Sequence, residues 1–463
     1  MKHHVQARPG HTRVQWTLAI LANSTLIFYG MESGWMSPMT KVLQSEESPV
    51  GAPISDNTIS LIASILCFTA TITTSIYSYI ADNFGRKPAV IAVAVPQALA
   101  WICKLSTSTT AGLMAARALN GFAAGGCFTI VPMYVKEISQ DDIRGLLGSL
   151  LIMGQNLGIF IMYAMGAYLD YYLVLWIVFS LPLVTAILML KAPESPAYLV
   201  KKGQFELAAK TIAFLRGLEI DDKIVQKEVD IMRDQEFFFQ SLPKISFLSI
   251  LRNRNWRHSV ILNVSIIAFQ ASNGVFAIIS YGASTLAASE VKHSISPELQ
   301  TLSFPVVMII GSFVSMGCVE RFGRKPLLAG TLLMSACSMG TLASAMLLQS
   351  YGFTPPIWLP VLAMIASVFA FAAGVAPLPF IIMAEMFNFQ IRAKMMGLAV
   401  TFAWFMTFVQ LFLYAPISSS LGPHSTFFCF AGVNLLGFFV TLIFLPETKG
   451  KSDEEIEAEL RKK

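Results

Sequence analysis

Twelve stretches of this chain are each long and apolar enough to cross a lipid bilayer. They lie near residues 15–38, 58–80, 88–105, 111–134, 147–168, 171–190, 258–283, 301–319, 326–349, 357–382, 396–416 and 425–445. A spanning helix needs about 20 apolar residues, because every backbone N–H and C=O must be satisfied inside the segment. Only 13% of the 463 residues are charged, roughly half the share in soluble domains. The sequence therefore predicts an all-α membrane protein with twelve transmembrane helices.

Basic residues gather in alternate loops between these stretches. One side would carry the N-terminal arm, the long loop before the seventh stretch, the tail, and loops that contain Arg86, Arg144 and Arg324. The other side holds only Lys41, Lys104 and Lys292. By the positive-inside rule, both termini are predicted to be cytoplasmic. The net charge of +5 is explained by this orientation, so the lipid bilayer is an expected partner and nucleic acid is not.

Nothing in the sequence indicates an enzyme. The six cysteines fall in the predicted helices and none has the spacing of a metal site: Cys67, Cys103, Cys127, Cys318, Cys337 and Cys429. The chain also contains no nucleophile–base arrangement, no phosphate-binding loop and no dinucleotide motif. We therefore expect no catalytic residues, no metal and no cofactor.

Short motifs recur in the two parts of the chain. Asp82-Asn-Phe-Gly-Arg-Lys87 returns 238 residues later as Glu320-Arg-Phe-Gly-Arg-Lys325; Glu137 and Arg144 return 248 residues later as Glu385 and Arg392; and Pro193-Glu-Ser195 returns 253 residues later as Pro446-Glu-Thr448. Three pairs at matching places predict two six-helix bundles of like fold. The expected domains are 1–195, a linker domain at 196–257, the second bundle at 258–448, and a tail at 449–463.

The repeated charges lie where predicted helices meet the cytoplasm, and Gly85 and Gly323 would permit tight turns there. Acidic and guanidinium groups at helix ends can form bidentate pairs between helices. Such pairs could hold the inner mouth of a pathway shut and break when the halves rock. The predicted gating set is Asp82, Arg86, Glu137, Arg144, Glu320, Arg324, Glu385 and Arg392. The alternative is that these charges merely anchor helix ends at the membrane surface.

These motifs, together with Arg117-x-x-x-Gly121 and Pro377-Leu-Pro379, make the chain resemble the sugar porters of the major facilitator superfamily over essentially its whole length. Gly30-x-x-x-Gly34 in the first stretch is most similar to the insect-type facilitated trehalose and hexose transporters. The resemblance implies two bundles that rock about a central site and move a sugar or polyol by facilitated diffusion, with the plasma membrane as the expected location. It also implies a small intracellular helical domain, for which Phe205–Arg216 and Lys223–Arg233 read as amphipathic helices.

The resemblance also implies a central sugar site, and there the sequence departs from the family pattern. Polar positions of the family fall on apolar residues here: Ile152, Phe269, Val275, Met308, Ala372, Phe380 and Ala403. The candidate substrate-binding residues are Gln270, Asn273, Gln155, Phe380 and Trp404, and Asn156, Ser272, Asn23 and Ser24 could compensate for the losses. Buried hydroxyls of a sugar need such partners, so a less polar solute is an alternative substrate.

Two ionisable residues fall within predicted spans, where charge is costly and often functional. Glu32 lies in the first stretch and Arg117 in the fourth. In proton-coupled members of the family an acid in the first helix pairs with this arginine, so a proton-coupled symporter that uses Glu32 and Arg117 is one alternative function. A solvated Glu32 facing the extracellular vestibule is the alternative for that residue. A non-transporting membrane sensor on the same fold is the remaining alternative for the chain.

Overall fold

The computed structural model describes residues 12–242, 246–287, 297–356, 358–387 and 389–451, together with 455, 456 and 459, and every regular element in these ranges is a helix. Lys292 lies outside them. The first part of the chain forms α1 (Thr12–Leu43), α2 (Asp56–Asn83), α3 (Arg86–Ser106), α4 (Thr110–Ile138), α5 (Asp141–Tyr168) and α6 (Tyr171–Met189). We call these six helices the N half.

Four short helices follow the N half: α7 (Pro196–Lys201), α8 (Phe205–Arg216), α9 (Lys223–Ser241) and α10 (Phe247–Arg252). The C half consists of α11 (Arg254–Ala271), α12 (Val275–Ala287), α13 (Pro297–Thr301), α14 (Ser303–Phe322), α15 (Arg324–Ser350), α16 (Trp358–Ala370), the π-helical turn η1 (Phe371–Val375), α17 (Leu378–Met386), α18 (Phe389–Leu421) and α19 (Pro423–Phe444). The all-α prediction is confirmed.

Eleven helical stretches in the described ranges are long and apolar enough to cross a membrane, and they coincide with eleven of the twelve predicted segments. The one predicted segment outside this set is the first, 15–38, which forms α1, a helix of 32 residues. It is less apolar because it contains polar residues such as Gln15, Asn23 and Glu32, which are buried inside the protein.

Three of the spans are interrupted. The eighth has a turn at Leu302 between α13 and α14, and the interruptions of the other two have local causes. The seventh span breaks between α11 and α12, where Gly274 has a φ of 100°, a conformation that side chains with a Cβ rarely adopt. The tenth span passes through η1, where Ala376 N donates to Phe371 O at 2.8 Å. Pro377 and Pro379 follow directly, and proline supplies no backbone N–H to a regular α-helix.

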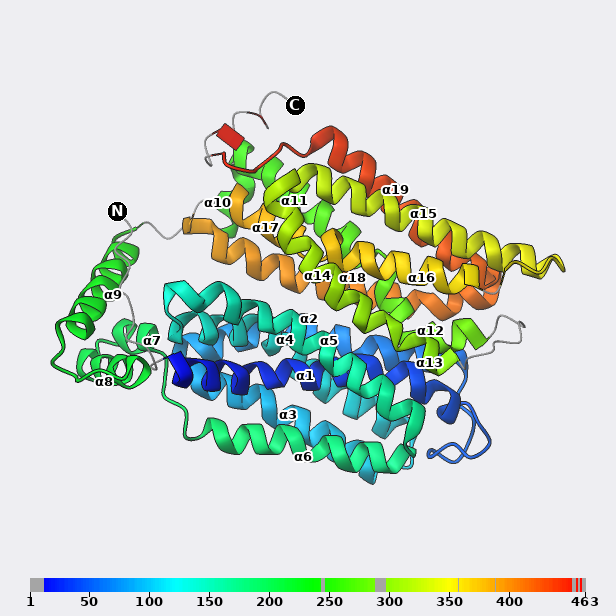
Figure 1. Cartoon of the computed structure of the whole chain (residues 1–463), viewed down its shortest axis with the longest axis horizontal. Coiled ribbons are helices and arrows are strands. Elements are labelled where there is room, and N and C mark those ends of the chain that lie inside the picture. The colour runs from blue at the N-terminus through cyan, green and yellow to red at the C-terminus, as the bar shows by residue number, and fades with distance from the viewer. Residues whose placement is uncertain are drawn as a thin grey trace.

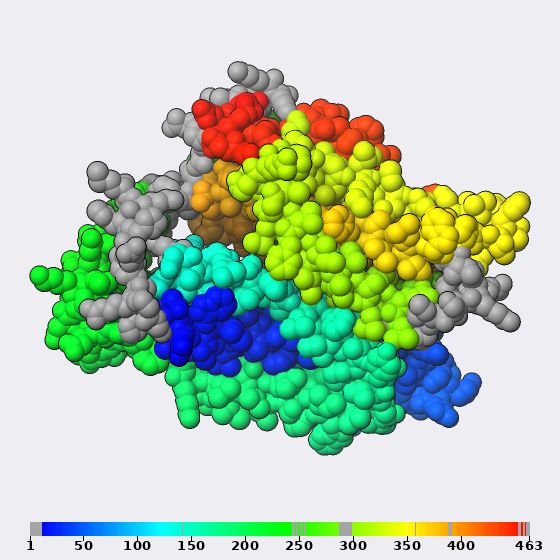
Figure 2. Space-filling model, in the orientation of Figure 1, coloured from blue at the N-terminus to red at the C-terminus, as the bar shows by residue number. Residues whose placement is uncertain are grey.

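The helices of each half pack mainly on one another. In the N half α1 lies along α5, α2 along α4, and α3 along α4 and α6. In the C half α15 lies along α16 and α19, and α11 along α18. The halves meet where α2 contacts α18, α1 contacts α12, and α5 contacts α13 and α14. Figure 1 shows the two groups as layers, and Figure 2 shows the blue-to-teal surface of the N half against the yellow-green surface of the C half.

Close contact between α1 and α5 depends on glycine. A Cβ on Gly30 would lie 2.0 Å from Gln155 O, and a Cβ on Gly158 would lie 2.0 Å from Ile27 O. Both obstacles are backbone atoms, which cannot move aside as a flexible side chain can. Any larger residue at Gly30 or Gly158 would therefore push the two helices apart.

Within the predicted linker, α7, α8 and α9 lie together at one end of the molecule, on the left in Figure 1, whereas α10 lies beside α11. The helix expected at 205–216 is α8, and the one expected from Lys223 is α9, which runs on to Ser241. Arg216 joins them, because its Nη2 lies 2.7 Å from Glu228 Oε1. Its Nη1 also donates to Ile138 O at 3.0 Å, which fixes the linker domain to α4.

Candidate functional site

We call the end of the helix bundle beside the linker domain the motif end, because the repeated charges lie there, and the opposite end the distal end. In the N half, Arg86 on α3 donates from Nε and Nη2 to Glu137 on α4, at 3.0 and 3.1 Å. Asp82 on α2 lies 3.8 Å from Arg86 Nη1. Ser195 Oγ donates to the same Glu137 carboxylate. A single arginine thus joins three helices at their ends.

The C half repeats this arrangement. Arg324 on α15 donates from Nε and Nη2 to Glu385 Oε1 on α17, at 3.0 and 2.7 Å. Glu320 on α14 lies 3.1 Å from Arg324 Nη2. Thr448 Oγ1 donates to Glu385 Oε2 at 2.6 Å. The spacing of the motifs in the sequence therefore reflects one three-dimensional cluster built twice.

A second carboxylate in each half caps a helix. Glu194 Oε1 accepts from the backbone N–H groups of Arg86 and Lys87, at 2.9 and 3.1 Å. Glu447 accepts from those of Arg324 and Lys325 at the same distances. These N–H groups open α3 and α15 and have no partner within the helix, so a carboxylate there stabilises the helix end. This helix-capping role of the Pro-Glu-Ser and Pro-Glu-Thr tags was not predicted.

The turn glycines were predicted for their conformation, and the structure adds a second reason for them. Gly85 and Gly323 have φ values of 116° and 90°. A Cβ on Gly85 would also lie 2.1 Å from Glu194 Oε2, and one on Gly323 would lie 2.7 Å from Glu447 Oε2. Glycine is therefore needed both for the turn and for the approach of the capping carboxylate.

Glu447→Gln should destabilise the protein in a pH-dependent way. Burial alone would raise the pKa of Glu447, but the N–H groups of Lys449, Arg324, Lys325 and Thr448 lower that pKa below its usual value. A lowered pKa adds stability above the unfolded pKa of about 4.3, and this stability is lost as pH falls through the folded pKa. Thermal unfolding of the purified protein should show a loss at neutral pH that disappears in strong acid.

The matched control for that experiment is Glu320→Gln at the same end of the molecule. The Glu320 side chain is 72% exposed, so the loss of its ion pair should cost less than about 1 kcal/mol at any pH. An equal loss for Glu447→Gln at neutral and at strongly acidic pH would show that the capping charge is not the cause.

The other two predicted gating arginines contact backbone carbonyls. Arg144 donates from Nε to Lys136 O at 3.2 Å and from Nη2 to Ser139 O at 3.1 Å. Arg392 donates from Nε to Phe387 O at 3.0 Å. Both therefore bind the ends of the preceding helices, α4 and α17. The ion pairs of Arg86 and Arg324 described above likewise join helices of one half.

The halves are joined by hydrogen bonds near the distal end. Tyr163 on α5 donates to Ile279 O on α12 at 2.6 Å. Ala283 N on α12 donates to Ser37 Oγ on α1 at 3.3 Å, and Ser60 Oγ on α2 donates to Leu411 O on α18. The distal end is therefore closed by direct contacts between the halves.

Between these contacts and the motif end lies an aromatic group shared by both halves. The Trp404 ring on α18 lies 5.9 Å from that of Tyr29 on α1 and 5.7 Å from that of Phe128 on α4, between ring centroids. Trp404 is buried, and Phe380 on α17 is half-buried within the C half. Of the two predicted aromatic residues, Trp404 is thus the one that contacts the N half.

The predicted polar residues of the central site differ in their burial and in their hydrogen-bond partners within the protein. Gln270 on α11 is buried and its Oε1 has no partner among the described residues, whereas Gln155 on α5 is half-buried. Asn273 already has partners, because its Nδ2 donates to Ser335 Oγ at 2.8 Å and to Asn434 Oδ1. Asn434 in turn donates to Asn273 O at 2.9 Å. Asn273 thus braces the α11–α12 break against α15 and α19 through its Nδ2 and its backbone carbonyl, while its buried Oδ1, like Gln270 Oε1, has no partner among the described residues.

Glu32 and Arg117 form the predicted pair, and a third residue joins them. Arg117 Nη1 on α4 lies 2.5 Å from Glu32 Oε1, and Lys104 Nζ on α3 lies 2.6 Å from Glu32 Oε2. The Lys104 Nζ also lies 4.0 Å from the ring centroid of Trp35 and 3.8 Å from that of Trp101. All of these side chains are almost completely buried. Glu32 is therefore not solvated in this structure.

Sequence reasoning missed Lys104 because it counted the residue among the exposed charges of the distal side. The signal was present in the helical spacing. Trp35 follows Glu32 by three residues and Lys104 follows Trp101 by three, so each pair lies on one helix face. The sequence does not say that the two faces meet.

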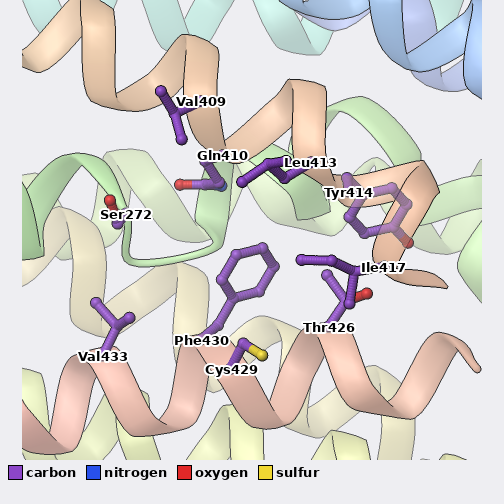
Figure 3. A pocket seen from close by; sticks show the side chains of 10 residues that line it. All are labelled: Ser272, Val409, Gln410, Leu413, Tyr414, Ile417, Thr426, Cys429, Phe430 and Val433. Atoms are coloured by element: carbon purple, nitrogen blue, oxygen red, sulfur yellow. The ribbon is translucent and has the colours of Figure 1, made fainter. Parts of the chain in front are cut away.

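A separate cavity of about 150 Å³ lies between α18, α19 and the α11–α12 break (Figure 3). Its lining is largely apolar and includes Phe430, Leu413 and Ile417. The amide of Gln410 and the hydroxyl of Thr426 are buried there without a partner among the described residues. The residues that line the cavity all belong to the C half, so it is distinct from the interface between the halves.

Comparison with known proteins agrees with this geometry. The family model described as "Sugar (and other) transporter" matches residues 18–460, so the chain belongs to that family. A facilitated trehalose transporter (Tret1) from Culex quinquefasciatus is 27% identical over 93% of this chain and 83% of its own length. Tret1 from Apis mellifera ligustica is 26% identical over 98% of this chain and 89% of its own.

Solved structures show the fold. The inward-open conformation of the xylose transporter XylE from E. coli matches 96% of this chain and 99% of its own with a TM-score of 0.77, at 19% identity. A crystal structure of a D-xylose–proton symporter matches 94% and 99% with a TM-score of 0.73, at 18% identity. The chain therefore has the major facilitator fold, and it is a transporter of this family rather than an enzyme.

Proposed function

We propose that the protein moves a sugar or polyol across a membrane by alternating access and facilitated diffusion. The observation that carries this proposal is the placement of contacts between the halves. Tyr163 and Ser37 tie the halves together at the distal end, while the ion pairs of Arg86 and Arg324 at the motif end stay within their own halves. Two halves joined at one end can rock, and rocking would open the ends in turn.

Sugar as the solute is supported by the relatives, which are named as facilitated trehalose transporters. Within this chain, the residues that would contact the solute are Gln270, Gln155, Trp404 and, secondarily, Phe380 and Asn273. Gln270 has a free buried acceptor, which a sugar hydroxyl would satisfy. Trp404 presents an aromatic ring where the two halves meet. A less polar solute is the alternative, since several polar positions of the family pattern fall on apolar residues in this sequence.

The same proposal extends to domains, gates and location. Residues 1–195 and 258–448 would be the two rocking bundles, with 196–257 as an intracellular linker domain and 449–463 as a tail. The motif end would face the cytoplasm together with both termini, in the plasma membrane, because basic residues concentrate there. The eight charged gating residues would hold the motif end closed in the opposite state by exchanging partners between the halves.

Uptake of radiolabelled trehalose, glucose and a few polyols into proteoliposomes tests the proposal, and Gln270→Leu tests the site. We expect saturable uptake of at least one sugar by the parent protein. Gln270→Leu should reduce uptake about tenfold at low solute concentration, because one lost hydrogen bond to a buried group costs about 1–3 kcal/mol. Gln410→Leu is the matched control, since Gln410 is also a buried amide of the C half without a partner among the described residues but lies in the separate cavity.

The outcomes separate the alternatives. Equal loss of uptake in Gln270→Leu and Gln410→Leu would remove Gln270 from the site. Binding of a sugar to folded protein without any uptake would favour a membrane sensor on this fold. Absence of both would reject the sugar and direct the search to less polar solutes.

A further inference from the structure

The buried cluster of Glu32, Arg117 and Lys104 contains two cations and one carboxylate. Each carboxylate oxygen has its own cation, Arg117 on Oε1 and Lys104 on Oε2. The side chains of Glu32 and Lys104 are 1% and 0% exposed, so solvent contributes little to either charge. A proton on Glu32 would leave two buried cations facing each other without a counter-charge, which is strongly unfavourable in a low-dielectric interior.

The two cations depend on Glu32 to different degrees. Arg117 also donates to three backbone carbonyls: Glu32 O at 2.8 Å, Ile62 O at 3.2 Å and Ala63 O at 3.3 Å. The hydrogen bond of Lys104 in the described structure goes to Glu32 alone. Loss of the Glu32 charge would therefore leave Lys104, not Arg117, without a polar partner.

Two tryptophans contact Lys104 with the faces of their indole rings. The indole N–H groups of Trp35 and Trp101 are both buried without a partner among the described residues. An unsatisfied buried donor costs about 1–3 kcal/mol, so neither ring is positioned by its N–H. Each presents its π face to the ammonium at 4.0 Å or less, and such contacts stabilise a desolvated cation. Both ring faces thus stabilise the ammonium of Lys104 beside the Glu32 carboxylate.

No other acid or base from the described helices faces the cluster. The titratable groups nearest to its three members are phenols and thiols from α1, α2, α3, α6 and α12: Tyr29, Cys67, Cys103, Tyr171 and Tyr281. None of these side chains is an ordinary proton acceptor for Glu32 near neutral pH. The charge of Glu32 is thus set by Arg117 and Lys104.

We propose that Lys104 keeps Glu32 permanently ionised and so uncouples solute movement from proton movement. This inference rests on the proposed transport function and states that a proton gradient does not drive it. Fold relatives include a D-xylose–proton symporter, and the Glu32–Arg117 pair alone could bind and release a proton. Lys104 is a positioning residue in this account, because it acts through Glu32 and not on the solute.

Lys104→Met tests the proposal, since methionine is an unbranched apolar chain that fits between two indole rings. Proteoliposomes that contain a pH-sensitive dye would report sugar uptake and internal pH together. Parent protein should take up sugar at a rate that does not change across mildly acidic to neutral pH, without moving protons. Lys104→Met should take up sugar faster as pH falls, by up to about tenfold per pH unit, the slope for one bound proton, and should acidify the interior when sugar is added.

Two further variants keep the test decisive. Lys104→Met combined with Glu32→Gln should lose the pH dependence again, because the proton acceptor is gone. Lys41→Met replaces an exposed lysine at the distal end of α1 and should behave as the parent. A pH-independent Lys104→Met protein that still transports would overturn the proposal, as would parent uptake that moves protons and loses this in Glu32→Gln.

A measurement without solute separates this inference from the proposed function. Infrared difference spectra on acidification should show no protonated-carboxyl band from Glu32 in the parent. Lys104→Met should show such a band, and the added Glu32→Gln change should remove it. If no variant carries sugar but these spectra appear as stated, the transport proposal fails, and only the part of the inference in which Lys104 keeps Glu32 ionised stands. A Glu32 band in the parent would refute the role of Lys104 whatever the solute.

Discussion

Glu32→Gln is expected to cost about 3–5 kcal/mol of stability, the range for breaking a buried ion pair by removing one partner. The change keeps the size of the side chain but removes the only negative charge between Arg117 and Lys104. Both cations remain buried, at 3% and 0% side-chain exposure. Thermal unfolding of the purified protein in detergent, followed by the fluorescence of Trp35 and Trp101 beside the cluster, measures the loss.

A double-mutant comparison shows whether charge is the cause. Adding Lys104→Met to Glu32→Gln removes one of the two uncompensated cations, so the double variant should be more stable than Glu32→Gln alone. Glu46→Gln is the control for loss of an acid at the same end, because Glu46 is exposed and should change stability by less than about 0.5 kcal/mol. A Glu32→Gln protein as stable as the parent would show that the carboxylate is not ionised in the folded state.

Gly158→Ala should be, with Gly30→Ala, among the most damaging single-methyl substitutions in the N half. The added Cβ would lie 2.0 Å from Ile27 O and 2.9 Å from Met31 N on α1, and neither backbone atom can yield unless the helices separate. Overpacking of this kind costs typically about 1–3 kcal/mol and occasionally more, and we expect the upper end. Thermal unfolding and the yield of folded protein measure it.

Gly148→Ala on the same helix is the matched control. A Cβ there would meet no atom within 4 Å, and alanine favours a helix over glycine by about 1 kcal/mol. That variant should be as stable as the parent or slightly more so. If Gly158→Ala behaved like Gly148→Ala, α1 and α5 would not be packed as closely as described.

Much of the fold could be predicted because hydropathy and charge are properties of the chain itself. Apolar length predicted the spans, and amphipathic spacing predicted α8 at the residues where it forms. The break at Gly274 was missed, because one glycine in an apolar run hardly changes hydropathy while its positive φ ends a helix. The π-helical turn was missed for a similar reason. Pro377 has no N–H, so a carbonyl several residues earlier loses its usual helical partner, and hydropathy does not show this.

The candidate site was harder to predict, since it depends on which helix faces meet. Because the same motifs occur twice, the sequence predicted that Arg86 and Glu137 in the N half have the same role as Arg324 and Glu385 in the C half. The partners of Asn273 and Lys104 come from helices distant in sequence, so no local pattern in one sequence identifies them. An amide or lysine within a span can bind solute or brace the fold, and only the packing distinguishes the two.

Cross-linking the halves at the distal end tests the central claim of alternating access most directly. Ser37 Oγ and Ala283 N are 3.3 Å apart across the interface, so Ser37→Cys with Ala283→Cys, in a protein without its other cysteines, is placed for a disulfide. Ser24→Cys with Thr185→Cys is the control, because those hydroxyls are 2.9 Å apart within the N half, where Ser24 faces α6 and not the C half. Oxidation should stop sugar uptake in the first pair, reversibly on reduction, and leave it intact in the second. Undiminished uptake with the halves locked together would contradict the account.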